Sequence, residues 1–207
     1  MDDRRIELAL WGLLGAGIVF LAVLGVLRGQ EQSPPPEPLP VIAEVPEFEL
    51  THRDGRTVSL DDFRGQPWVA DFIFTRCVAV CPRMSVRMME VAEALGEESP
   101  VRLASFSVDP EHDTPEVLDT YAQRYKAGPN WYFLTGEAET LHRLTREGFL
   151  IALDLDPDPE IRNGLDPIVH SNRFVLVDEE ARIRGYYDPF ESGEVERLLG
   201  DLERLSP

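Results

Sequence analysis

The fold is predicted most directly by the stretch Asp71-Phe72-Ile73-Phe74-Thr75-Arg76-Cys77-Val78-Ala79-Val80-Cys81-Pro82-Arg83-Met84, which contains both cysteines of the chain. The apolar run over residues 68–74 predicts a buried strand. Pro82 then opens a pattern of apolar residues at helical spacing, and proline is well tolerated in the first turn of a helix. We therefore expect Cys77 in a strand-to-helix turn and Cys81 at the N-terminus of the helix.

This placement has chemical consequences for the two sulfurs. The positive end of the helix dipole favours a thiolate over a thiol, and the thiolate is both the nucleophile and the metal ligand. Two soft sulfurs separated by three residues can converge on one point. They indicate either a redox-active dithiol or half of a site for a soft metal ion such as Cu(I). The alternative is a structural disulfide or a pair of inert buried thiols.

The overall composition narrows the class of protein. The 207 residues include 38 acidic and 20 basic side chains, which give a formal net charge of -18. A nucleic-acid partner is excluded, because binding to phosphates needs a basic face and the sequence shows none. Two cysteines cannot build a disulfide-rich scaffold, so we expect an ordinary hydrophobic core in one domain of about 150 residues with appendages.

The N-terminal region predicts a membrane anchor. Residues 8–27 carry no charge and are long enough to cross a bilayer as a helix, whereas residues 1–7 are expected in the cytoplasm because Arg4 and Arg5 precede the span. The proline-rich residues 28–43 predict an extended tether, and residues 44–207 a soluble domain outside the cytoplasm. A cleaved export signal is the alternative for the apolar segment.

The remaining pattern alternates strands with helices and ends in a hairpin, which predicts an α/β fold: a mixed sheet with helices on both faces. The Asp-Gly pair at residues 54–55 predicts a β-hairpin near the start of the domain. Strands are expected at residues 48–50, 57–60, 68–74, 101–108, 131–135, 149–155, 173–178 and 182–187. Helices are expected at residues 82–95, 114–125, 137–147 and 194–205.

Four blocks of this sequence carry a resemblance. The block Phe48-x-Leu50…Asp54-x-x-x-x-Ser59-Leu60-x-Asp62-Phe63-x-Gly65 resembles the N-terminal part of thioredoxin-like proteins. The other three are the cysteine stretch 71–84, Ser107-Val-Asp109-Pro110-x-x-Asp113-Thr114-Pro115, and His170-Ser171…Leu176-Val177-Asp178. Together they resemble the Sco/SenC family, over roughly residues 44–205. The family's members are membrane-anchored copper proteins with a thioredoxin-like fold that serve the assembly of cytochrome c oxidase.

The resemblance implies a metal site in this chain. Cys77, Cys81 and His170 match the family's copper ligands, and two thiolates with one imidazole suit Cu(I), or Cu(II) with one further ligand. Asp109 and Asp113 match an acidic motif that lies near the metal in the family. An alternative for both is structural, because Asp-Pro can close a strand and an Asp-Thr-Pro sequence can begin a helix.

Several positions depart from the family pattern or keep two interpretations. Ala79 stands where several members have an acidic residue, and His112 stands where the family often has another polar residue. Asp71 is interpreted either as a neighbour of the metal ligands or as half of an ion pair with an arginine. Met84 and Met88 are assigned to the core. His52 and His142 are assigned to the surface, on a turn and a helix.

The resemblance favours a copper metallochaperone in a bacterial inner membrane, with its soluble domain in the periplasm. Its expected partners are the copper-accepting subunit of a haem–copper oxidase and other copper chaperones or thiol reductases. The alternative is a thiol–disulfide oxidoreductase that reduces the cysteines of a copper-accepting partner, with Cys77 and Cys81 as the catalytic pair. A copper or redox sensor that signals to a membrane partner is a third class.

Overall fold

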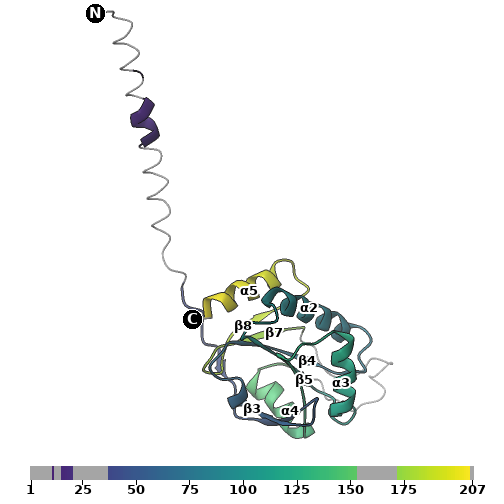
Figure 1. Ribbon diagram of the computed structural model, residues 1–207. Coiled ribbons are helices and arrows are strands. Elements are labelled where there is room, and N and C mark those ends of the chain that lie inside the picture. The colour runs from purple at the N-terminus through teal and green to yellow at the C-terminus, as the bar shows by residue number, and fades with distance from the viewer. Residues whose placement is uncertain (1–10, 12–14, 21–36, 153–171, 206–207) are drawn as a thin grey trace, which may run out of the picture. The chain divides into compact units, whose positions relative to one another are not determined.

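The computed structural model describes residues 11, 15–20, 37–152 and 172–205 (Figure 1). The chain divides into two compact units, Met1–Pro38 and Leu39–Pro207. In the first unit, residues 15–20 are helical. None of the helices in the described ranges is both long and apolar enough to cross a membrane. Most of the anchor predicted at residues 8–27 lies outside the described residues.

The second unit is built on one mixed sheet. In the described residues this sheet has eight strands, in the order β1-β8-β7-β4-β5-β6-β2-β3. The three central strands β4, β5 and β6 are parallel to one another, whereas the other neighbouring pairs are antiparallel. The strands are β1 (Ala43–Glu44), β2 (Glu49–His52), β3 (Thr57–Ser59), β4 (Trp68–Ile73), β5 (Arg102–Ser107), β6 (Trp131–Thr135), β7 (Phe174–Val177) and β8 (Arg182–Tyr187).

Helices cover both faces of the sheet, as the sequence predicts. They are α2 (Val80–Leu95), α3 (Pro115–Arg124), α4 (Ala138–Arg143) and α5 (Glu194–Leu205), with a 3-10 turn η1 (Leu60–Asp62) and a π turn η2 (Leu144–Gly148). Figure 1 shows α2 and α5 over one face and α4 on the other. Helix α3 shares the face of α2, because the hydroxyls of Ser85 and Tyr121 lie 2.8 Å apart between these two helices. This agrees with right-handed crossovers from β4 to β5 and from β5 to β6.

Strand β4 is buried along its whole length, which explains its nearly unbroken apolar sequence. On the α4 side, Trp68 and Phe72 of this strand pack against Phe106 of β5 and against Phe149, with ring centroids 5.1–6.4 Å apart. Asp71 is the one charged side chain in β4, and it points to the opposite side because side chains alternate along a strand. A fully buried strand therefore ends just before the turn that carries Cys77.

Three local expectations differ from the structure. Helix α2 begins at Val80 rather than at Pro82, which is its third residue, where an N–H group has no partner within the helix. Residues 149–152 form no strand, and the rest of the strand predicted at 149–155 lies outside the described residues. His52 is not a surface residue of a turn: it lies in β2 and is only 6% exposed, and burial lowers its pKa.

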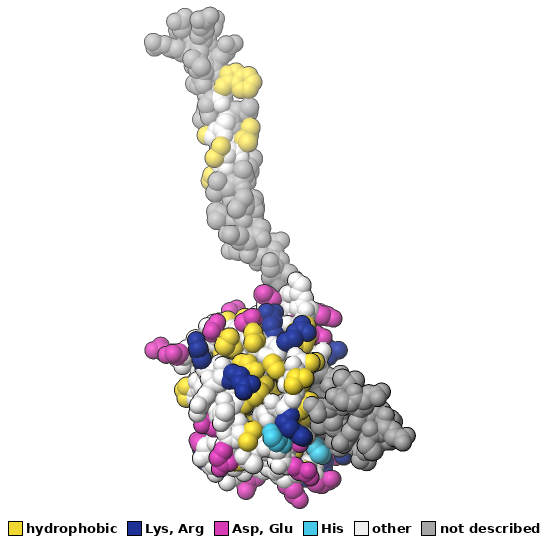
Figure 2. Space-filling model, turned by 90° about the vertical axis from the view of Figure 1, so that its right-hand side faces the viewer, with side chains coloured by type: hydrophobic (Ala, Val, Ile, Leu, Met, Phe, Trp, Pro, Cys, Tyr) yellow, Lys and Arg dark blue, Asp and Glu magenta, His cyan; other side chains and the backbone are white. Residues whose placement is uncertain are grey.

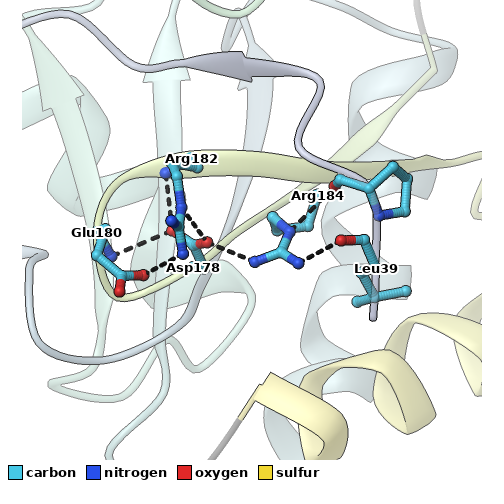
Figure 3. Close-up of polar contacts among 6 residues, drawn as sticks. Leu39, Asp178, Glu180, Arg182 and Arg184 are labelled. Atoms are coloured by element: carbon cyan, nitrogen blue, oxygen red, sulfur yellow. Dashed lines mark hydrogen bonds and ion pairs between the residues drawn. The ribbon is translucent and has the colours of Figure 1, made fainter. Parts of the chain in front are cut away.

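A cluster of charged side chains fixes the point where the chain enters the second unit (Figure 3). Asp178 accepts hydrogen bonds from the backbone of Arg182 and from the Arg182 and Arg184 guanidinium groups, at 2.7–2.8 Å. Arg184 also donates to the carbonyls of Leu39 and Pro40. Burial would raise the pKa of Asp178, but these hydrogen bonds hold it below its usual value.

We expect Asp178→Ala to lower the free energy of unfolding by about 3 kcal/mol, because it leaves the nearly buried Arg184 without its carboxylate. This contribution is present above the ordinary Asp pKa of 3.8 and is lost as the pH falls below it. The measurement is urea unfolding. The control is Glu180→Ala, which removes an exposed partner of Arg182 and should cost less than about 1 kcal/mol. Equal losses in both variants would contradict the prediction.

Candidate metal centre

The two cysteines lie where the sequence predicts, at the junction of β4 and α2. Cys77 is half-buried in the turn and Cys81 is only 3% exposed in the first turn of the helix; both are free thiols. The N–H of Cys81 donates to the Sγ of Cys77 at 3.3 Å, and the N–H of Cys77 donates to the Phe74 carbonyl at 3.2 Å. The turn is therefore closed by its own backbone, and it brings the more exposed sulfur against the backbone of the more buried cysteine.

The electrostatics of Cys81 do not follow the helix-dipole argument alone. Burial raises the pKa of this thiol, and the neighbouring Cys77 and Asp71 add to the rise, while a hydrogen bond with the Phe74 backbone opposes it. The loss of water is thus the largest influence on this thiol. The Cys81 thiol stays protonated at neutral pH until a metal ion or a reaction partner removes its proton.

Asp113 holds the turn from the other side. Its carboxylate is buried and accepts hydrogen bonds from the Thr75 hydroxyl at 2.5 Å, the Thr75 N–H at 3.2 Å and the Ser107 hydroxyl at 2.7 Å. Burial raises the pKa of Asp113, although the bonds from Thr75 and Ser107 oppose this. The cap of α3 is made by Thr114, whose hydroxyl accepts from the N–H of Val117. Asp113 therefore fastens the end of β4 rather than the start of α3.

Asp109 acts on the next residue along the chain. Its carboxylate pairs with the guanidinium of Arg76, at 2.6 and 2.9 Å, and its N–H donates to the Ser107 hydroxyl. The two aspartates thus bind Thr75 and Arg76, the two residues directly before Cys77. The sequence singled out the aspartates but not Thr75, Arg76 or Ser107. Thr75 and Arg76 lie in the cysteine stretch and Ser107 begins the aspartate block, but no local pattern marks which aspartate each one contacts.

Asp71 has no ion pair with an arginine, so that interpretation is wrong for the part of the chain that the structure describes. Its side chain is 0% exposed, and neither carboxylate oxygen has a hydrogen-bond partner there. Burial raises the pKa of Asp71 to about 7. The side chain of Ser105, its partner on the neighbouring strand, opposes the rise. An acid of this pKa changes its charge near neutral pH, beside Cys81.

The remaining candidate ligands fall into three groups. His170 lies outside the described residues, and the structure forms no cluster of three His, Cys, Asp or Glu side chains within the ranges that it does describe. Met84 and Met88 are buried in the core, as predicted. His112 is exposed, and a ring nitrogen of the half-buried His142 lies 3.1 Å from the Val108 carbonyl.

Comparison with known proteins places this arrangement in a family. The SCO1/SenC family model matches residues 38–206. This chain belongs to the SCO1/SenC family. The resemblance of this sequence to the family is thereby confirmed. The structure confirms the predicted mixed sheet with flanking helices.

Individual members show how far the similarity extends. The SCO1 protein homolog of Bacillus subtilis is 33% identical over 196 residues, which are 93% of this chain and 95% of the relative. The structure of BsSco, described as a member of the Sco family of cytochrome c oxidase assembly proteins with a disulfide switch, is 32% identical with a TM-score of 0.69, over 81% of this chain and 96% of the other. Bradyrhizobium japonicum ScoI, solved with copper bound, is 25% identical with a TM-score of 0.66, over 79% and 99%.

We expect Asp113→Ala to lower the free energy of unfolding by about 3 kcal/mol, because two hydroxyls and one N–H lose a buried acceptor. The looser turn should also let an alkylating reagent reach Cys77 faster. Urea unfolding and the alkylation rate measure the two effects. Glu111→Ala, an exposed change in the same loop, should alter stability by less than about 0.5 kcal/mol. A stable Asp113→Ala with unchanged alkylation would refute the fastening role.

Asp71 predicts an unusual dependence of stability on pH. Its pKa is about 7 in the folded chain against an ordinary 3.8, so the folded state favours the protonated acid. The wild type should therefore lose stability relative to Asp71→Asn as the pH rises through this window, by up to about 4 kcal/mol when the loss is complete. The measurement is the difference in unfolding free energy between the two reduced, metal-free proteins. A difference that is constant with pH would contradict the raised pKa.

Proposed function

We propose that this protein is a copper metallochaperone that serves assembly of the copper centre of a haem–copper oxidase. The observation that carries the proposal is the pair of free cysteines closed against each other at the start of α2, in a family with a copper-bound member. Two adjacent soft sulfurs suit Cu(I) better than they suit hard cations. We further propose His170 as the third ligand, on the strength of its match to the family motif.

Copper would be held here as cargo rather than as a resident cofactor. Binding requires that Cys81 lose its proton, which its burial disfavours in the free protein, so copper competes with a proton at this sulfur. Oxidation of the two thiols to a disulfide removes two ligands at once. In that exchange a partner disulfide takes up the two electrons and is reduced, so copper release and partner reduction can be coupled.

The proposed location is a bacterial inner membrane, with residues 8–27 as a single anchor and the copper-binding domain in the periplasm. This rests on the uncharged N-terminal segment and on the arginines that precede it. Copper-accepting subunits of haem–copper oxidases, other copper chaperones and thiol reductases are the proposed partners. An anchor in the partner's own membrane would confine the search for it to two dimensions.

One observation favours a thiol–disulfide oxidoreductase as the second candidate. Cys77 is half-exposed and Cys81 is buried, which is the asymmetry expected of an attacking and a resolving thiol. The buried Asp71, with a pKa of about 7, could accept the proton of the second thiol. The two candidates use the same cysteines but make different demands on His170.

The deciding experiment is an anaerobic Cu(I) titration of the reduced protein against a competing chelator, for the wild type, His170→Ala and His112→Ala. We expect one tightly bound copper per chain, weakened at least about tenfold in His170→Ala because a direct ligand is lost. His112→Ala is the matched control, since it removes an exposed imidazole outside the ligand set, and it should bind like the wild type.

Weak, non-stoichiometric binding that is indifferent to His170 would overturn the chaperone proposal. If the same protein then reduces a partner disulfide, and Cys77→Ser abolishes this activity, the oxidoreductase becomes the better description. A loss of affinity in His112→Ala as large as that in His170→Ala would instead overturn the assignment of the third ligand.

A further inference from the structure

The chain segment that carries the two cysteines differs in charge from the rest of the sequence. Residues 72–89 contain no aspartate or glutamate, whereas they contain Arg76, Arg83 and Arg87. The chain as a whole has 38 acidic and 20 basic residues. Acidic residues are therefore absent from the segment that forms the turn and the first turns of α2.

Of these three arginines, Arg83 is the one placed to meet a partner. Arg76 is paired with Asp109, and Arg87 donates to the Pro189 carbonyl and pairs with Glu90. Arg83 is exposed and makes no ion pair with any residue in the described ranges, and its guanidinium lies over the ring of Phe190, 4.4 Å from the centroid. The Phe190 ring orients the guanidinium by contact with one of its faces and leaves the edge of the guanidinium to solvent.

Two exposed apolar side chains belong to the same segment as this cation. Val78, in the turn between the cysteines, is 93% exposed, and Val86, one helical turn beyond Arg83, is 42% exposed. An isolated exposed valine on a free loop needs no explanation. This valine stands on a turn that Asp109 and Asp113 fasten at the two residues before Cys77, so it is held outward by the structure.

The face drawn in Figure 2 combines apolar and basic side chains. Hydrophobic side chains gather in its middle with Lys or Arg side chains among them, and most Asp and Glu side chains lie toward its edges. A partner that exchanges a ligand with Cys77 must come within bonding distance of that sulfur. It must therefore cover Val78, the next residue in the chain.

We propose that Val78, Arg83, Val86 and Phe190 form a docking surface for an acidic protein, whose carboxylates surround an apolar centre next to its own thiols. This rests on the proposed function, because it describes the partner that exchanges copper or a disulfide with Cys77. Arg83 steers and orients the acidic partner, and Val78 is buried on contact. The net charge of -18 repels an acidic partner, and the positive charge of Arg83 offsets this repulsion where the two proteins meet, so the partner associates faster.

The test uses the full-length protein in nanodiscs of zwitterionic lipid, with the soluble copper-receiving domain of the same organism's haem–copper oxidase as the probe. The variants are Arg83→Glu and Val78→Asp. The matched control is Lys126→Glu, an equal charge reversal at an exposed residue beside the loop that follows the other end of α2. Copper affinity is measured first for each protein, and copper transfer is then followed by stopped flow at several salt concentrations.

We expect Arg83→Glu to keep the wild-type copper affinity. Compared with the wild type at equal copper loading, both variants should transfer copper at least about tenfold more slowly, with the effect of Arg83→Glu shrinking as salt rises. Lys126→Glu should behave as the wild type. Transfer by Arg83→Glu and Val78→Asp at the wild-type rate would overturn the docking surface while leaving the copper site intact. The same holds if Lys126→Glu slows transfer equally.

Two further outcomes separate this proposal from its neighbours. If the wild type binds no copper, the proposed function fails, and the docking surface is then tested by the binding of the metal-free protein to the same probe. A higher dissociation constant for Arg83→Glu than for the wild type would support the surface, and an unchanged one would overturn it. In nanodiscs rich in phosphatidylglycerol, protection of Cys77 from alkylation in the wild type but not in Arg83→Glu would assign the surface to the membrane. That result would overturn a protein as its occupant.

Discussion

The Asp113 carboxylate is the contact on which the geometry of the site depends. It joins the end of β4, through Thr75, to the end of β5, through Ser107. Because these are neighbouring parallel strands buried in the core, the carboxylate transfers the rigidity of the sheet to the turn that follows. Asp109 repeats the arrangement one residue later, through Arg76. Asp109 and Asp113, which match the family's acidic motif, thus support the turn that carries Cys77, whatever that turn binds.

Two physical effects compete at Cys81, and burial wins. A helix N-terminus stabilises negative charge, but only within its first turn and by an amount that water or salt easily reduces. Removing the thiol from water disfavours the charge and is the largest cause of the raised pKa of Cys81, and the neighbouring Asp71 adds to it whenever it is ionised. Burial therefore favours the neutral form of the Cys81 thiol in the metal-free protein. A reduced protein of this kind resists accidental deprotonation, and its two sulfurs differ in availability although they lie next to each other in space.

The sequence was sufficient for the parts of the fold that are governed by local pattern. The apolar run of β4, the helical spacing after Cys81 and the Asp-Gly hairpin depend on neighbouring residues, and the structure confirms them. His52 was misjudged because its burial comes from Tyr132, far along the chain, and no local signal reports this. The roles of Thr75 and Arg76 were missed for the same reason, since each is defined by an aspartate more than thirty residues away. A site that would combine the cysteine stretch with a residue as distant as His170 is beyond what spacing within one segment can establish.

The contact between Arg184 and the carbonyls of Leu39 and Pro40 has a practical meaning for the limits of the domain. The sequence predicted a boundary at residue 44, yet these carbonyls and the pairing of β1 with β8 lie at or before it. A fragment that begins at residue 44 would leave an almost buried guanidinium without two of its acceptors and would remove half of an edge strand. A protease that cuts the chain ahead of Leu39 would instead release a domain whose charged cluster is complete. The second unit therefore begins at Leu39, and the residues from there on belong to the same folded domain.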